Sequence, residues 1–338
     1  MSFCDPMLRK SVPWSTIALI ACLALVAGTP LAAEAGAREE KAMAQRVSAE
    51  LKAALALETM PWQEVNALIL QERFAEFESL SRSYEEKFKT DPKYESPLTK
   101  LYASLDARND RLWQKLDKWV ATRPSYISHG ARGIARQKGG DLARGTLYAN
   151  ETAPEQIKRM RQMHLQAIPD LLAALKENRR FAPAYESLID IDRAVGDSAS
   201  AERVLREAVR WIPETYYVRY AYLTVLRPKW GGDYSLMQAY ANSQSEAARL
   251  NPRIWSLRAE VPADLGSSAW VSQDYTEAIK YYTEALRYGD RLEFLKKRGQ
   301  LFWRIGNYAA ARRDFARYLE YQADPDVIRW KKTLDQVK

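Results

Sequence analysis

A helix-turn-helix pattern near the C-terminus constrains the fold more than any other feature of the sequence. Within residues 294–326, apolar or small residues three and four positions apart predict two helices, joined by a Gly306-Asn307 turn. The positions that carry this pattern are Leu295, Gly299 and Phe302, then Tyr308, Ala311, Phe315 and Leu319. A preceding copy places Ala278 33 residues before Ala311. A hairpin of this size cannot bury both of its faces alone, so neighbouring copies are expected to stack.

This pattern resembles the tetratricopeptide repeat, which pairs a small residue in its first helix with Ala-x3-Phe in its second. A further copy lies upstream, where Tyr185 and Leu188 lead to a Gly196-Asp197 turn and then to Ala201, Leu205, Ala208 and Pro213. The resemblance implies an all-α fold, a solenoid of helical hairpins in which the first helix of each hairpin lines a concave groove. We expect such repeats over residues 179–323, followed by a polar cap helix over 324–338 that Asp324-Pro325 starts.

One unit of the array is longer than the others. The Ala-x4-Pro pattern of Ala208 recurs at Ala247, 39 residues later, where a period of about 34 is expected. The excess of five residues matches Pro228–Gly232, so we expect a loop at 227–233 inserted between two helices, the second carrying Leu236, Tyr240, Ala247 and Leu250. Two roles are possible for this loop, which contains Trp230, Gly231 and Gly232: it binds a ligand, or it fills the gap that a lengthened turn opens.

The first half of the chain, residues 36–178, shows helical patterns without a regular period. We expect helices over 38–57, 74–88 and 154–177, and a further pair between 98 and 120. Gly139-Gly140 predicts a loop or a helix break. Together, the Ala131-Arg132-Gly133 segment and the Pro-Lys-Trp-Gly-Gly motif at 228–232 resemble a family of uncharacterised exported bacterial proteins, a domain of unknown function found beside tetratricopeptide repeats. That resemblance covers roughly residues 68–252 and implies no particular activity.

The N-terminus has the features of a signal peptide. Arg9 and Lys10 precede an apolar run, Ile17–Ala27, and Ala33-Glu34-Ala35 fits a cleavage site, so residues 1–35 are expected to be removed. Two alternatives are an uncleaved anchor and a lipoprotein modified at Cys22. Because Cys4 and Cys22 are the only cysteines, the remaining chain would have no disulfide. A periplasmic or secreted location follows, with no membrane span after cleavage.

Charge and residue types argue against several functions. The net charge is +8, but basic and acidic residues are interspersed, so we expect no nucleic-acid partner. His129 and His164 are the only histidines, and no motif for a metal, a cofactor or a nucleophile is present. We therefore predict no enzyme, metal or cofactor. The alternative is a peptidoglycan- or glycan-processing protein that uses residues 129–145, Trp230 and the carboxylates of Glu186, Asp190 and Asp192.

The concave stripe is the predicted binding site. On the tetratricopeptide pattern it contains Lys296, Gln300, Trp303 and Arg304, with Val218 and Tyr222 from the inserted unit. Cationic and aromatic side chains suit an extended protein segment that carries acidic or C-terminal carboxylate groups. The sequence thus predicts a non-catalytic scaffold or adaptor of the bacterial cell envelope that binds a protein or peptide partner in this groove.

Overall fold

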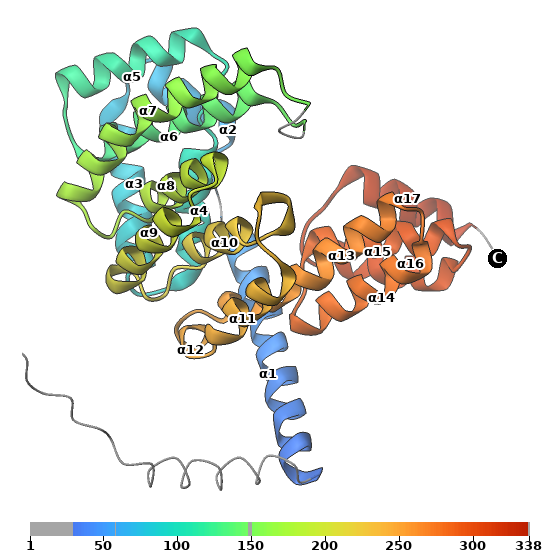
Figure 1. Cartoon of the computed structure of the whole chain (residues 1–338). Coiled ribbons are helices and arrows are strands. Elements are labelled where there is room, and N and C mark those ends of the chain that lie inside the picture. Colours follow the sequence, from blue (N-terminus) through green and yellow to red (C-terminus); the bar gives the residue numbers. More distant parts are fainter. Residues whose placement is uncertain (1–29, 58, 148–150, 337–338) are drawn as a thin grey trace, which may run out of the picture. The chain divides into compact units, whose positions relative to one another are not determined.

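The computed structural model describes residues 30–57, 59–147 and 151–336, and every regular element in these ranges is a helix (Figure 1). The predicted all-α class is confirmed. None of the helices described is both long and apolar enough to span a membrane. Most of the predicted signal peptide, residues 1–29 of 1–35, lies outside the described residues. The described residues from Met43 onward form one compact unit, and the described residues before Met43 belong to another.

The helices of the first half are α1 (Pro30–Leu55), α2 (Trp62–Leu70), α3 (Phe74–Phe88), α4 (Glu95–Ala103), α5 (Asp110–Thr122), α6 (Tyr126–Arg144) and α7 (Pro154–Glu177). Those that follow are α8 (Ala182–Val195), α9 (Ser198–Trp211), α10 (Tyr217–Val225), α11 (Tyr234–Ser243), α12 (Ala247–Leu250), α13 (Glu260–Val271), α14 (Tyr275–Ala285), α15 (Leu292–Arg304), α16 (Tyr308–Leu319) and α17 (Pro325–Asp335). Short 3₁₀ segments are η2 (Pro92–Tyr94), η3 (Pro228–Trp230), η4 (Pro252–Ala259) and η5 (Leu286–Tyr288).

The expected break at Gly139-Gly140 is wrong, because α6 runs unbroken from Tyr126 to Arg144. Its glycines lie where α6 packs against neighbouring side chains. A Cβ atom on Gly139 would lie 2.4 Å from Met163 Cε, and one on Gly140 would lie 2.5 Å from the His164 ring, both on α7. Glycine is used here to allow close approach of two helices, so its helix-breaking tendency is outweighed by packing.

A charged cluster also joins α6 to α7. The Asp170 carboxylate of α7, 5% exposed, accepts hydrogen bonds from His129 Nδ1 at 2.9 Å and from Arg132 and Arg136. Burial alone would raise the pKa of Asp170, but the hydrogen bonds from Arg132 and His129 lower it below its ordinary value. The Ala131-Arg132-Gly133 segment therefore has a structural role in holding two helices together.

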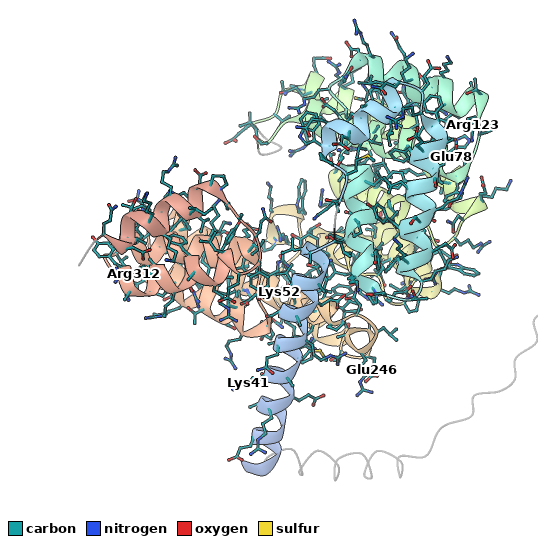
Figure 2. The ribbon with its side chains drawn as sticks, turned by 180° about the vertical axis from the view of Figure 1, so that it is seen from behind. Lys41, Lys52, Glu78, Arg123, Glu246 and Arg312 are labelled. Atoms are coloured by element: carbon teal, nitrogen blue, oxygen red, sulfur yellow. The ribbon has the colours of Figure 1, made fainter. Side chains whose placement is uncertain are left out.

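The first half also contains a buried carboxylate that joins α3 to the end of α5. Glu78 accepts hydrogen bonds from the Trp119 indole at 3.1 Å and from Arg123 at 3.3 Å (Figure 2). The Trp119 ring in turn stacks on Phe74 with a centroid distance of 5.0 Å. These contacts satisfy the polar atoms that packing of the aromatic core would otherwise leave unpaired.

Glu95 links the first half of the chain to the helices that follow. Its carboxylate is fully buried and accepts hydrogen bonds from the backbone N–H groups of Tyr216 at 2.8 Å and Tyr217 at 3.2 Å, and from the Thr215 hydroxyl. These N–H groups lie at the start of α10, where a helix lacks internal acceptors for its first donors. Burial raises the pKa of Glu95, although the hydrogen bonds from Thr215 and Tyr216 oppose that shift.

The predicted hairpins are present. Between α8 and α9, Gly196 adopts a positive φ of 78° and Asp197 caps α9 by accepting from Ser200 N. Between α15 and α16, Gly306 and Asn307 do the same, with a φ of 79° at Gly306. Only a residue that tolerates the left-handed region permits so short a turn, which explains why the turn dipeptides predicted the hairpins well.

The second helix of the inserted unit is divided, which differs from the single helix expected from Leu236 to Leu250. It ends at Ser243, and α12 begins at Ala247. Ser243 and Ser245 donate their hydroxyls to the carbonyls of Tyr240 and Asn242, at 2.7 and 2.9 Å. Such local side-chain bonds compete with the helix, so a serine-rich stretch interrupts the apolar pattern.

Four hydrophobic clusters form the core along the chain. The first extends from Val65 to Val225, and the others cover Tyr216–Leu257, Ala259–Leu301 and Leu295–Leu334. Successive clusters overlap or adjoin in sequence, as expected when each hairpin packs on the next. The predicted boundary at residue 178 lies inside the first of them and stays a prediction.

Candidate partner-binding groove

The predicted stripe on α15 lies away from the side chains that this helix buries. Phe294, Leu295, Gly299 and Leu301 are buried, whereas Lys296, Gln300 and Trp303 are half-buried and Arg304 is exposed. The helical period explains the division, because positions 296, 300, 303 and 304 share one face. The four predicted positions therefore lie on one face of α15, and their role in binding stays a prediction.

Three tryptophans surround a hollow on this face. Trp303 and Gln300 of α15 line it with Arg304, together with Trp270 of α13 and Trp330 of α17, and the space has a volume of about 390 Å³. The Trp303 and Trp330 rings are 6.5 Å apart in an edge-to-face arrangement. We name this site the tryptophan hollow, defined by Trp270, Gln300, Trp303, Arg304 and Trp330.

Trp270 and Trp330 were missed in the sequence reasoning. Trp270 precedes Trp303 by 33 residues, the spacing of Ala278 and Ala311, so the repeat period predicts an equivalent position. Trp330 could not be found in this way, because α17 was interpreted as a solvated cap. Its ring also packs 5.7 Å from Phe315, which anchors the cap helix to the last hairpin.

The Lys296 side chain forms an ion pair and an aromatic contact within the protein. Its ammonium lies 2.8 Å from Asp324 Oδ2 and 5.2 Å from the centre of the Trp330 ring. The hydrogen bond from Lys296 lowers the pKa of Asp324 to about 2, and the backbone N–H of Val327 adds to this effect. Since Asp324 caps α17, Lys296 positions the helix that supplies Trp330.

Arg304 remains exposed beside the tryptophan hollow, although one of its nitrogens is occupied. Nη1 donates to the Tyr275 hydroxyl at 2.9 Å, and the guanidinium lies 5.2 Å from the centre of that ring. This contact restrains a long side chain and leaves other N–H groups of the guanidinium for an acceptor. The groove therefore has one oriented cation at its edge.

Tyr222 and Val218 do not belong to this surface, contrary to expectation. Val218 is fully buried and Tyr222 is only 9% exposed, with its ring 4.9 Å from that of Tyr240. The insertion displaces the second helix of this unit, and Tyr222 packs against that helix instead of facing a groove. In this irregular unit, the position of Tyr222 within the repeat therefore did not predict how exposed its side chain is.

The inserted loop packs against side chains of α6 and α8. The half-buried Trp230 has the guanidinium groups of Arg193 and Arg144 at 5.3 and 5.5 Å from its ring. Gly231 has a φ of 91°, and a Cβ atom on Gly232 would lie 2.1 Å from the Leu226 carbonyl oxygen. Both glycines are thus required by the backbone, and Trp230 covers α6 and α8 side chains in the way a gap-filling residue would.

The carboxylates considered for catalysis lie on α8. Burial raises the pKa of Glu186 to about 8, and the neighbouring Asp190 adds to this shift. Burial likewise raises the pKa of Asp190 to about 6, although Arg193 pairs with it at 2.9 Å. Burial also raises the pKa of Asp192. Within the described residues, no group of three histidine, cysteine or acidic side chains could hold a metal ion.

The two histidines serve helix packing. His129 bonds to Asp170, and His164, 1% exposed, lies with Nε2 3.2 Å from the Gln137 carbonyl and 3.1 Å from Asp141 Oδ1. Both contacts join α6 to α7. Neither histidine contacts the Glu186 and Asp190 carboxylates by a hydrogen bond in the structure, so these groups do not form an acid-base pair with them.

One comparison with known proteins agrees with the repeat pattern. A family model described as tetratricopeptide repeat matches residues 263–328, which run from within α13 through α16 to the start of α17. A crystal structure of a tetratricopeptide repeat protein from Parabacteroides merdae aligns with 81% of this chain and 99% of its own, at 12% identity and a TM-score of 0.37. A search of curated proteins found no match. Over residues 263–328, which contain every residue of the tryptophan hollow except Trp330, the chain is therefore similar to the tetratricopeptide repeat family.

Proposed function

We propose that this protein is a non-catalytic scaffold of the bacterial cell envelope that binds an extended segment of a partner protein in the tryptophan hollow. The observation that carries the proposal is the hollow itself, in which Trp270, Trp303 and Trp330 from three helices face one space. All of its residues except Trp330 lie within the stretch that matches the tetratricopeptide repeat, a type of repeat that generally mediates protein-protein interaction. Aromatic side chains of this kind supply much of the binding energy of protein interfaces.

The chemistry of the hollow favours a particular kind of segment. Indole faces pack well on proline rings and on aromatic side chains, and an extended proline-containing chain loses little entropy on binding. Arg304 offers N–H donors at the edge, where a carboxylate of the partner would form a charge-assisted hydrogen bond. We therefore propose a segment that contains proline or aromatic residues and an acidic group.

A peptide-binding assay tests this proposal. Fluorescent decapeptides with alternating proline and aromatic residues, ending in either glutamate or lysine, would be titrated with the protein and followed by anisotropy. We expect the acidic series to bind more tightly, and Trp303→Ala to weaken binding at least about tenfold, the loss of roughly 1.4 kcal/mol. Trp62→Ala is the matched control, because Trp62 is 54% exposed on α2, far from α15 in the sequence. Equal binding by wild type and Trp303→Ala would reject the hollow as the binding site.

The envelope location rests on the predicted signal peptide and has its own test. Mass spectrometry of the protein purified from a bacterial periplasmic fraction should show an N-terminus near residue 36. A mature chain that begins at a diacylated Cys22 would support the lipoprotein alternative instead, and retention of residues 1–35 in a membrane fraction would support the anchor.

A further inference from the structure

A second cavity lies away from the tryptophan hollow. It has a volume of about 280 Å³ and is lined by polar and aromatic side chains, among them Tyr216, Tyr217, Tyr220, Arg253, Asp290 and Arg291. Val47 and Leu51 of α1 form an apolar wall. The other elements that contribute are the start of α10, η4 and the segment that leads into α15. We name it the Arg253 cavity.

Arg253 differs from the other charged residues around this cavity because it has no ionic partner. Asp290 pairs with Arg317, Arg291 with Glu260, and Glu293 with Lys297, each at 2.8 Å. For Arg253, no carboxylate oxygen of the described residues lies within the 4.0 Å of an ion pair. The guanidinium of Arg253 is therefore not in direct contact with a carboxylate of the described residues, and the buried Glu95 carboxylate acts on it only from a longer distance.

Two tyrosines hold this guanidinium in place. Its central carbon lies 4.4 Å from the ring centre of Tyr216 and 4.8 Å from that of Tyr217, and Nη2 donates to the Tyr217 hydroxyl at 3.2 Å. Nη1 is buried and has no hydrogen-bond acceptor in the structure. Aromatic faces orient a guanidinium, but they leave the hydrogen bond of Nη1 unmade, and an additional acceptor would supply it.

Asp290 supplies an unsatisfied acceptor in the same cavity. Its side chain is 2% exposed, Oδ2 accepts from Arg317 and Tyr321 at 2.8 and 2.5 Å, and Oδ1 is buried without a donor. The residues that line the cavity thus include an arginine whose Nη1 has no acceptor and an aspartate whose Oδ1 has no donor. A single small molecule with a carboxylate and an ammonium group would satisfy both.

We propose that the Arg253 cavity binds a small zwitterion, a free amino acid or a short peptide, with its carboxylate on Arg253 and its ammonium on Asp290. The cavity is near the lower end of the 300–1,000 Å³ typical of ligand pockets, which suits a molecule of this size. The ligand's side chain packs against the three tyrosines and against Val47 and Leu51. This proposal does not depend on the tryptophan hollow, because the two sites share no lining residue.

Calorimetry and thermal unfolding with a chemical series test the proposal. The probes are free phenylalanine and leucine, their amides, which lack the carboxylate, their N-acetyl forms, which lack the ammonium, and the corresponding dipeptides. We expect at least one free amino acid or dipeptide to bind and to raise the Tm, with at least tenfold weaker binding of its amide and its N-acetyl form. The difference between the free and the dipeptide series identifies which of the two the cavity takes.

Two variants make the result specific to this cavity. Arg253→Gln should abolish binding of the zwitterion, while Arg249→Gln, at an exposed position on α12, should leave it unchanged. Because Arg253→Gln could impair folding, Tyr220→Phe is the second variant. It removes from the lining a hydroxyl for which no hydrogen bond is found among the described residues. We expect this variant to bind the zwitterion several-fold more weakly and to keep the circular dichroism spectrum of the wild type. No binding of any probe at millimolar concentration, or equal binding by wild type and by both cavity variants, would overturn the proposal.

Discussion

Arg132 donates two hydrogen bonds to Asp170, from Nε to Oδ2 at 2.8 Å and from Nη2 to Oδ1 at 2.7 Å. This bidentate pair joins α6 to α7. The last hairpin has a corresponding pair, because Arg298 of α15 donates to Asp314 of α16 from Nε at 2.8 Å and from Nη2 at 2.7 Å. Both helix pairs therefore combine a largely buried Arg–Asp pair with apolar packing, and substitutions at either kind of contact are expected to change stability.

Asp170→Asn should be strongly destabilising. The substitution leaves Arg132, Arg136 and His129 next to a neutral amide in a largely buried place, and breaking such a pair costs about 3–5 kcal/mol in the free energy of unfolding. Urea denaturation followed by circular dichroism measures this. Asp117→Asn is the control, since that carboxylate is 57% exposed and contacts the same two arginines, and we expect a change of about 0–1 kcal/mol. A similar, small change in both variants would contradict the structural role of Asp170.

Gly130→Ala should destabilise the protein although alanine favours a helix. A Cβ atom at this position would lie 2.3 Å from Cε1 of Phe181, a fully buried ring that is not able to move without disturbing its neighbours. Overpacking costs about 1–3 kcal/mol, which exceeds the gain of roughly 1 kcal/mol in helix propensity. Gly36→Ala on α1 has no atom within 4 Å of the new Cβ and should leave stability unchanged or raise it. The Tm of the two variants distinguishes these effects.

Glu186→Gln should stabilise the protein at alkaline pH and have little effect in acid. Burial, with Asp190 and Glu95 nearby, raises the pKa of Glu186 to about 8 from an ordinary 4.5. Between these values the folded state holds a proton that the unfolded chain has lost, so stability falls as pH rises from 4.5 to about 8. The glutamine variant avoids this loss, and a shift of this size corresponds to a gain of up to roughly 4 kcal/mol at pH 8.

Chemical denaturation of this variant at pH 5 and pH 8 provides the measurement. Glu202→Gln on α9 is a suitable control, because Glu202 is 49% exposed and its substitution should change stability equally at both pH values. A pH dependence of Glu186→Gln identical to that of wild type would show that Glu186 is ionised in the folded state at neutral pH.

Charge reversal in the groove should separate binding from stability. Arg304→Glu replaces an exposed cation next to the tryptophan hollow, so it should weaken binding of the acidic decapeptides with little change in Tm. Lys296→Glu places a carboxylate beside Asp324, the residue that caps α17, so it should lower the Tm as well. Anisotropy and thermal unfolding on both variants check this, and unchanged affinity in Arg304→Glu would remove that residue from the site.

The repeats were predictable from sequence because their turns depend on local chemistry. Each of these turns needs a residue with a positive φ followed by a residue that caps the next helix. The dipeptides Gly306-Asn307 and Gly196-Asp197 supply both, so two adjacent residues in the sequence are enough to predict the turn. The stripe at Lys296, Gln300, Trp303 and Arg304 followed from the resemblance to the tetratricopeptide repeat together with the helical period. Trp270 could have been found from the same period, whereas Trp330 depends on how the last helix packs.

The failures occurred where tertiary contacts decide the outcome. Gly139 and Gly140 were interpreted as breakers, since nothing local in the sequence reveals that α7 lies against them. Tyr222 was placed on an exposed stripe, but its exposure depends on the displaced second helix of an irregular unit. The unpaired guanidinium of Arg253 is likewise visible only once the positions of all nearby carboxylates are known.

The bonds from the start of α10 to Glu95 have a practical consequence for dividing the gene. A fragment that starts at residue 179 would keep Tyr216 and Tyr217 but remove the carboxylate to which their backbone N–H groups donate. A fragment that stops at residue 178 would expose Glu95 to solvent, and with it the apolar surface that packs against α8 and α10. Expression of either half alone is therefore expected to give an aggregation-prone product, and the useful cloning unit extends from α1 through α17.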